Sequence, residues 1–172
     1  ELFVREIFAH LAQGLSWDPR PSDGHLDSIR RSIILATAGS YGDPSTVQEA
    51  QNRFDHYMKD PESLHPDLRG IVMGLVAQEG DEDTYGKLWQ LHSKSTLSEE
   101  KVRLLIALSR FKNKDLLAET LSRSMDSQYV RSQDTVIAVA SVARNRFGRD
   151  LAWEFLKSNW DEFDRRYGQG GF

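Results

Sequence analysis

Apolar residues recur every three or four positions along most of this chain, and that period constrains its fold more than any other feature. Such a spacing places side chains on one face of an α-helix. The apolar stripes lie at positions 26–36, 47–58, 68–76, 85–92, 104–108, 117–125 and 136–143. No stretch shows the sustained alternation of apolar and polar residues that is typical of a half-buried strand. The sequence therefore predicts an all-α protein.

Several residues between the stripes are of the kinds that begin a helix. Asp43 is a predicted N-cap because Pro44 follows it at the first helical position, where the missing N–H of proline costs nothing. Asn113 is predicted to cap the helix that carries the sixth stripe. Thr96, with Glu99 three residues later, has the pattern of a capping box. These signals predict short helices that are separated by turns.

The predicted helix starts recur roughly every 15–22 residues, so helix pairs would recur about every 32–40 residues. This spacing is typical of helical-repeat proteins. The repeats match no tetratricopeptide or ankyrin pattern, so HEAT-like helix pairs are predicted. We expect one α-α superhelical domain over residues 1–172, with about eight helices after an entering helical segment. Residues 14–28 hold two prolines and two glycines and are predicted to connect that segment to the array.

Composition limits the kinds of partner that are expected. The chain carries a formal net charge of −4 and has a pI near 5.7. This acidity argues against a nucleic-acid partner, because nucleic-acid binders usually present a strongly basic face. The absence of cysteine favours a reducing compartment and predicts a cytoplasmic location. No apolar run is long enough to span a bilayer, so no membrane association is expected.

No motif for catalysis or metal binding occurs in the sequence. A catalytic zinc site usually needs two histidines one helical turn apart and a third ligand. No two of the histidines are four residues apart; they are His10, His25, His56, His65 and His92. Phosphate-binding glycine motifs and the G-x-S-x-G nucleophile elbow are also absent. We therefore assign no catalytic, cofactor-binding or metal-binding residue within the 172 residues.

Three arginines are the candidate binding residues. Arg144, Arg146 and Arg149 lie where a helix–helix turn is predicted, and repeat proteins often present binding residues on the turns of one face. One interpretation is a contact with an anionic partner or a peptide carboxylate. The other is a solvated surface whose local ion pairs each contribute little. Nucleic-acid binding at this turn is a third hypothesis, which the net acidity disfavours.

Trp153 and Trp160 lie in the last helical stretch, GRDLAWEFLKSNWDEF. Such a pair forms either a ligand platform or part of the core. One continuous helix would place both rings on a broad apolar face with Leu156 and Phe163, so the periodicity favours the core. The YGQGGF that follows is predicted to stop this helix and to form a flexible exit.

The chain resembles the C-terminal helical domain of M1-family zinc aminopeptidases, and among them the puromycin-sensitive type. The segments that carry the resemblance are VRSQD, GRDLAWEFLKSNWDEFDRRYGQGGF, LSWDPRPSDGHLDSIRRSIILATAGSYGDPSTVQEAQNRF, LHPDLRGIV and SEEKVRLLIALSRFKNKDLL. They cover almost the whole chain in the family's order and spacing. In that family a separate thermolysin-like domain carries H-E-x-x-H and G-A-M-E-N motifs, and neither motif occurs here.

The resemblance implies that this chain is a fragment of a larger multidomain enzyme that removes N-terminal residues from peptides. The segment would be non-catalytic, would shape the substrate cavity and would control access to it. Its implied partners are the catalytic domain of the same polypeptide and peptide substrates, and the implied zinc would be bound by the missing catalytic domain. No functional residue of the family can be carried onto a position of this sequence. A freestanding HEAT-like protein-interaction scaffold is the alternative.

Overall fold

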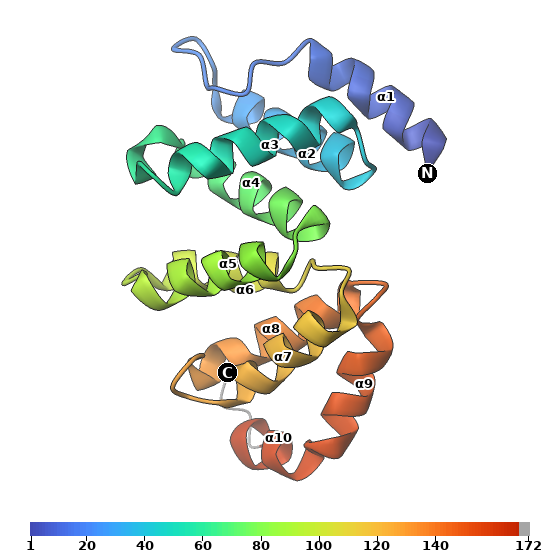
Figure 1. The fold of residues 1–172 in the computed structure, drawn as a ribbon, viewed down its shortest axis with the longest axis vertical. Coiled ribbons are helices and arrows are strands. Elements are labelled where there is room, and N and C mark those ends of the chain that lie inside the picture. Colours follow the sequence, from blue (N-terminus) through green and yellow to red (C-terminus); the bar gives the residue numbers. More distant parts are fainter. Residues whose placement is uncertain (169–172) are drawn as a thin grey trace. The chain divides into compact units, whose positions relative to one another are not determined.

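The computed structural model describes residues 1–168, and this part is helical without any strand (Figure 1). The elements in chain order are α1 (Leu2–Gln13), α2 (His25–Ser40), α3 (Pro44–Tyr57), the short 3-10 helix η1 (Pro61–Ser63), α4 (Pro66–Glu79), α5 (Glu82–Lys94), α6 (Ser98–Leu108), α7 (Lys114–Met125), α8 (Ser132–Arg144), α9 (Arg149–Ser158) and α10 (Trp160–Tyr167). The all-α prediction is confirmed. Over the same residues, no helix is both long enough and apolar enough to cross a membrane.

The chain divides into two compact units, Glu1–Gln78 and Glu79–Phe172. In the first unit α1 packs on α2, and α2 packs on α3. A Cβ added to Gly39 of α2 would lie 2.5 Å from Cδ1 of Leu75 in α4, so these two helices approach closely at that glycine. Leu35 and Phe54 are fully buried in this unit.

Polar contacts of two arginines fix the connector between α1 and α2. Arg31 is buried, pairs with Asp23 and donates a hydrogen bond of 2.8 Å from Nε to the Ser16 carbonyl oxygen. Arg53 of α3 pairs with Asp18 at 2.7 Å. Its guanidinium carbon also lies 5.2 Å from the ring centre of Trp17. The connector was expected to end at residue 28, but α2 already begins at His25.

Helix starts follow side-chain chemistry at some of the predicted caps. Asp43 accepts a hydrogen bond from the Thr46 amide, and Asn113 accepts one from the Asp115 amide, so both predicted N-caps are confirmed. The predicted cap at Thr96 is wrong. Helix α6 begins at Ser98, and its N-cap Leu97 contributes no side-chain hydrogen bond.

The second unit is built from α5 to α10. Helix α5 packs on α6, α7 on α8, and α8 on both α6 and α9. Its core includes Phe111, whose ring packs edge-to-face on Tyr85 with centroids 5.3 Å apart. The Tyr85 hydroxyl lies 3.1 Å from Oγ1 of Thr120, so this buried phenol has a hydrogen-bond partner on α7.

The last predicted helix is two helices in the structure. Helix α9 ends at Ser158, and α10 begins at Trp160. Asn159 between them has φ −115° and ψ 20°, and its Nδ2 donates a hydrogen bond of 2.8 Å to the Phe155 carbonyl oxygen. That bond gives a second donor to a carbonyl at the end of α9 that also accepts a hydrogen bond of 3.1 Å from the Asn159 amide. The predicted helix stop is confirmed at Gly168, and the predicted exit at residues 169–172 lies outside the described part of the chain.

Candidate functional site

The three arginines predicted from the sequence lie at the turn between α8 and α9. Arg144 is the last residue of α8, and Arg149 is the first residue of α9. All three are exposed, Arg146 included. The predicted position at a helix–helix turn is therefore confirmed, while a role in binding is a separate question.

Asn145 fastens this turn to the turn between α6 and α7. Its Nδ2 donates hydrogen bonds to the carbonyl oxygens of Ser109, at 2.9 Å, and Phe111, at 2.7 Å. Its Oδ1 accepts a hydrogen bond of 3.0 Å from the Phe147 amide. One half-buried amide therefore sets the relative position of two turns that are distant in the sequence.

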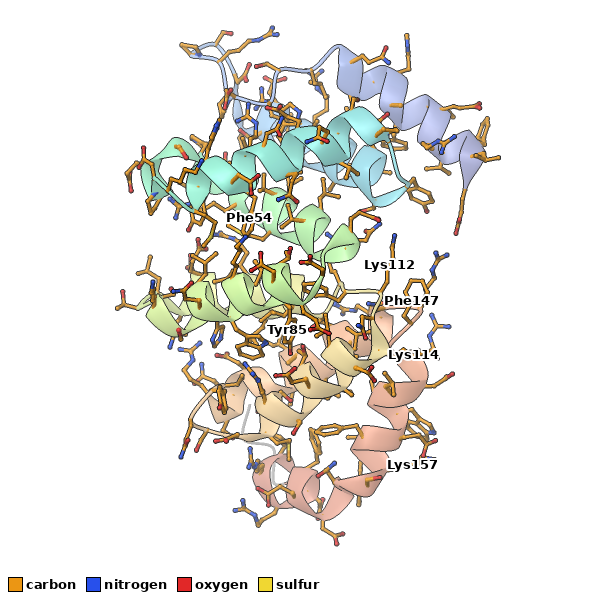
Figure 2. The ribbon with its side chains drawn as sticks, viewed as in Figure 1. Phe54, Tyr85, Lys112, Lys114, Phe147 and Lys157 are labelled. Carbon is orange, nitrogen blue, oxygen red and sulfur yellow. The ribbon has the colours of Figure 1, made fainter. Side chains whose placement is uncertain are left out.

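The Asn145 contacts bring further cations into the same region. The α6–α7 turn carries Lys112 just after Phe111, and Lys114 begins α7. Figure 2 shows Lys112, Lys114 and Phe147 at the end of the unit where α7 and α9 begin. We call the set the basic turn cluster, and its members are Arg110, Lys112, Lys114, Arg144, Arg146 and Arg149.

Carboxylates of the protein neutralise only part of the positive charge of this cluster. Lys112 pairs with Glu79 at 2.6 Å, and the Arg146 guanidinium lies 4.8 Å from the Phe147 ring centre. The other three exposed cations form no ion pair with any of residues 1–168; they are Lys114, Arg144 and Arg149. By contrast, many cations elsewhere have carboxylate partners, among them Arg53, Arg123 and Arg131.

Burial lowers the pKa of the Arg110 guanidinium in this cluster. An arginine is nevertheless charged at neutral pH, because its ordinary pKa lies far above 7. Glu79 pairs with Lys112, and Asp115 and Asp150 follow Lys114 and Arg149 in the sequence. The exposed cations Lys114, Arg144 and Arg149 therefore carry local positive charge, although the chain as a whole is acidic.

Gly148 allows α9 to begin immediately after the turn. A Cβ at this position would lie 2.6 Å from Cγ1 of Val142 and 2.8 Å from the Val142 carbonyl oxygen. Both distances are too short for any other residue to fit without a shift of the backbone. The turn between Arg144, at the end of α8, and Arg149, at the start of α9, is therefore short.

Sequence reasoning missed Lys112, Lys114 and the role of Asn145. A local signal exists, because both turns contain an asparagine between two cations, in Lys112-Asn113-Lys114 and in Arg144-Asn145-Arg146. The two asparagines act differently. Asn113 caps its own helix, whereas Asn145 bonds to the other turn. Only the tertiary structure reveals that difference.

A second feature is an apolar groove between α8, α9 and α10, with a cavity volume of about 610 Å³. Trp153 and Trp160 line it and are 58% and 57% exposed, so the prediction that both belong to the core is wrong. The break at Asn159 explains the difference for Trp160, because the three-and-four rhythm does not continue from α9 into α10, while Trp153 lies within α9, where Ala152 is the buried residue. The remaining lining residues are Val136, Val139, Ala140, Ala143, Arg149, Ala152, Leu156, Phe163, Asp164, Tyr167 and Gly168.

A buried aromatic group between α5 and α7 is the third feature. His92 is 3% exposed, and its ring centre lies 5.2 Å from that of Trp89. The Arg123 guanidinium carbon lies 5.0 Å from the ring centres of both Trp89 and Tyr129. Burial, and secondarily the charge of Lys101, lowers the pKa of His92 to about 4. His92 is therefore a neutral core residue at physiological pH.

Within the described residues, no three His, Asp or Glu side chains are placed where they could hold a metal ion together. The buried His92 packs on an aromatic ring, and the carboxylates near the basic turn cluster lie among cations. The features that the described residues do present are the exposed cations of the basic turn cluster and the apolar groove.

Comparison with known proteins identifies a matching family model and several aminopeptidases with similar sequences. The family model described as "ERAP1-like C-terminal domain" matches residues 1–172. The chain is 30% identical over 164 residues to Aminopeptidase M1-A of Oryza sativa subsp. japonica, covering 92% of this chain and 18% of the relative. It is 29% identical over 173 residues to Aminopeptidase M1 of Arabidopsis thaliana, covering 98% and 19%. It is 28% identical over 158 residues to human glutamyl aminopeptidase, covering 91% and 16%.

Proposed function

Because the chain belongs to the family of ERAP1-like C-terminal domains, we propose that it is the C-terminal helical domain of a zinc-dependent aminopeptidase. The observation that carries this proposal is the family match over all 172 residues. The named relatives are aminopeptidases, and this chain spans less than a fifth of the length of each one described above. This proportion favours a domain of a larger enzyme over a freestanding interaction scaffold.

The domain is non-catalytic in this proposal. A zinc aminopeptidase needs clustered nitrogen and oxygen ligands and an open coordination position for water. This sequence has no H-E-x-x-H motif and no cysteine, so its residues do not fit a catalytic zinc. The zinc would be held by the catalytic domain of the same polypeptide, which is the proposed partner of this chain.

The proposed role is to shape the cavity that peptide substrates enter. Stacked helices provide extended binding surfaces, and a cleft beside a catalytic domain can restrict the length and charge of what enters. Two surfaces in the second unit are available for this role, namely the basic turn cluster and the apolar groove. The candidate peptide contacts are Arg144, Arg146 and Arg149.

Two finer assignments rest on the sequence. The motif order resembles the puromycin-sensitive type of aminopeptidase, and we propose that subtype for the parent enzyme. The absence of cysteine is consistent with a reducing compartment, so we propose a cytoplasmic location. Fractionation of cells that express the tagged parent protein, together with puromycin inhibition of the purified enzyme, tests both assignments.

The first experiment separates the domain from its parent. The purified 172-residue chain and the parent protein are each assayed on an aminoacyl p-nitroanilide, with and without added zinc. The parent should turn over the substrate and lose activity with a chelator, while the isolated chain should be inactive in both conditions. Chelator-sensitive turnover by the isolated chain, or an inactive parent, would contradict the proposal.

The second experiment tests the role in substrate access. Arg144, Arg146 and Arg149 are replaced together by alanine in the parent enzyme, and kcat/KM is measured for a long peptide and for a dipeptide-sized substrate. We expect a loss for the long peptide alone, because only that substrate reaches beyond the catalytic centre. Equal effects on both substrates would remove any role of these residues in holding the distal part of a peptide.

A further inference from the structure

We propose that the basic turn cluster is a binding site for an acidic polypeptide segment, which is recognised through its Asp and Glu side chains. The inference rests on the proposed function only in that peptides are taken as the molecules this domain meets. It adds the ligand's chemical class, and it adds Lys112 and Lys114 to the arginines already considered. Its basis is the juxtaposition of two cation-bearing turns through Asn145.

The first argument concerns the positive charge of the cluster that is not paired with a carboxylate. Lys114, Arg144 and Arg149 are exposed, and they form no ion pair with a carboxylate among residues 1–168. Like charges held close together repel one another, and a bound anion relieves that repulsion. Arginine also offers a planar fork of donors that can bind a carboxylate through two parallel hydrogen bonds.

The second argument is that the cations are held in place. Asn145 donates two hydrogen bonds that join the α8–α9 turn to carbonyl groups of the α6–α7 turn, and it accepts a third from the Phe147 amide within its own turn. Gly148 fixes where α9 begins, because the space at its Cα is filled by Val142. A site whose backbone is fixed before binding loses less conformational entropy when the ligand arrives.

The third argument favours carboxylates over a nucleic-acid backbone. Glu79 neutralises Lys112, and Asp115 and Asp150 follow Lys114 and Arg149 directly in the chain. A continuous phosphate backbone carries closely spaced charges that these carboxylates would repel. A flexible peptide with separated carboxylates can place each one beside a cation and avoid the acidic positions.

The experiment measures binding of a labelled peptide to the parent protein by fluorescence anisotropy, with a chelator present so that the peptide is not cleaved. The probe is a short Gly-Ser peptide with interspersed glutamates and an amidated C-terminus, which removes any contribution from the terminal carboxylate. We expect binding that weakens as NaCl is added and that is lost when glutamine replaces each glutamate.

The test variant is the double substitution Arg144→Gln and Arg149→Gln. Its matched control is Lys94→Gln and Lys157→Gln, which removes the same charge from the far ends of α5 and α9. We expect Kd to rise about tenfold in the test variant, which corresponds to about 1.4 kcal/mol, and to change less than about twofold in the control. Circular dichroism confirms that both variants fold, and Lys114→Gln alone should raise Kd by a smaller factor.

Three outcomes would overturn the proposal. One is the absence of saturable binding to the glutamate peptide, and another is an equal loss of binding in the test and control variants. The third is tighter, cluster-dependent binding of a single-stranded oligonucleotide with the same number of charges, which would assign the site to nucleic acid. None of these readouts needs turnover, so an enzyme that is inactive on aminoacyl substrates would contradict the proposed function without deciding the binding site.

Discussion

The side chain of Asn145 donates a hydrogen bond of 2.7 Å to the backbone carbonyl of Phe111 and so joins two turns that belong to different helix pairs. Phe111 is fully buried, so its carbonyl lies next to the core of the second unit. A second bond to the Ser109 carbonyl and an accepted bond from the Phe147 amide complete the contacts of this side chain. Both the position of the cations and the stability of the unit therefore depend on one amide.

Replacement of Asn145 by alanine should lower the free energy of unfolding by about 2 kcal/mol, because it leaves carbonyl groups without their donors. Asn145→Asp should also destabilise, since a carboxylate cannot donate to the Phe111 carbonyl. Urea unfolding of the 172-residue chain measures both. Asn52→Ala is the control, because the exposed Asn52 side chain accepts a hydrogen bond only from Gln48 among residues 1–168. Its loss should cost under about 0.5 kcal/mol.

Local signals in the sequence predicted the fold class and some helix starts because they act over a few residues. Asp43 and Asn113 cap their helices as their sequence neighbours suggest. The same reasoning failed at Thr96, where the helix begins one residue later than a capping box requires. It also failed at Asn159, since an asparagine inside a periodic stretch does not by itself predict whether the helix ends there.

The candidate site was predictable only in part for a related reason. The arginines of the α8–α9 turn are neighbours in the sequence, so their clustering could be read directly. Lys112 and Lys114 join them only because Asn145 reaches a carbonyl of another turn, and no local pattern encodes that contact. The tryptophans show the opposite error, since both were expected to be buried on one continuous helix, and periodicity alone does not reveal the break after which Trp160 begins a new helix.

Trp160→Ala should cost clearly less stability than Phe111→Ala. Trp160 is 57% exposed on the groove, whereas Phe111 is fully buried. The area that Trp160 withdraws from water predicts a loss of about 1–2 kcal/mol. Phe111→Ala should cost about 3–5 kcal/mol because it also leaves a cavity. Urea unfolding of the two variants compares them, and an equal or larger loss for Trp160 would mean that its ring is buried in solution.

Two glycine substitutions should have opposite signs. Gly39→Ala should destabilise the chain by about 1–3 kcal/mol, because the added Cβ would lie 2.5 Å from Cδ1 of Leu75. Gly86→Ala should stabilise it by about 0.5–1 kcal/mol, because Gly86 lies inside α5 with no atom within 4 Å of the new Cβ, and alanine favours the helix. Thermal unfolding of both variants tests the pair, and a stabilising Gly39→Ala would show that α2 and α4 are further apart.

Protonation of His92 should destabilise the second unit at mildly acidic pH. The pKa of His92 is about 4 in the folded protein, against an ordinary 6.5, because burial and the nearby Lys101 disfavour its charged form. Between these two values the unfolded chain binds the proton and the folded chain does not. The neutral histidine therefore contributes its full stability above pH 6.5, and that contribution falls as the pH drops toward 4.

The size of this effect follows from the same two pKa values, and it is on the order of 3 kcal/mol between pH 6.5 and pH 4. His92→Gln cannot take up the proton, so its stability should change less over this range even if it is lower at neutral pH. The carboxylates with lowered pKa, such as Asp43 and Asp81, lose their stabilisation as the pH falls through and below their ordinary value of 3.8, and this loss is common to the wild-type chain and His92→Gln. Urea midpoints at several pH values measure both slopes. Identical slopes for the wild-type chain and His92→Gln would show that His92 titrates normally and is accessible to water.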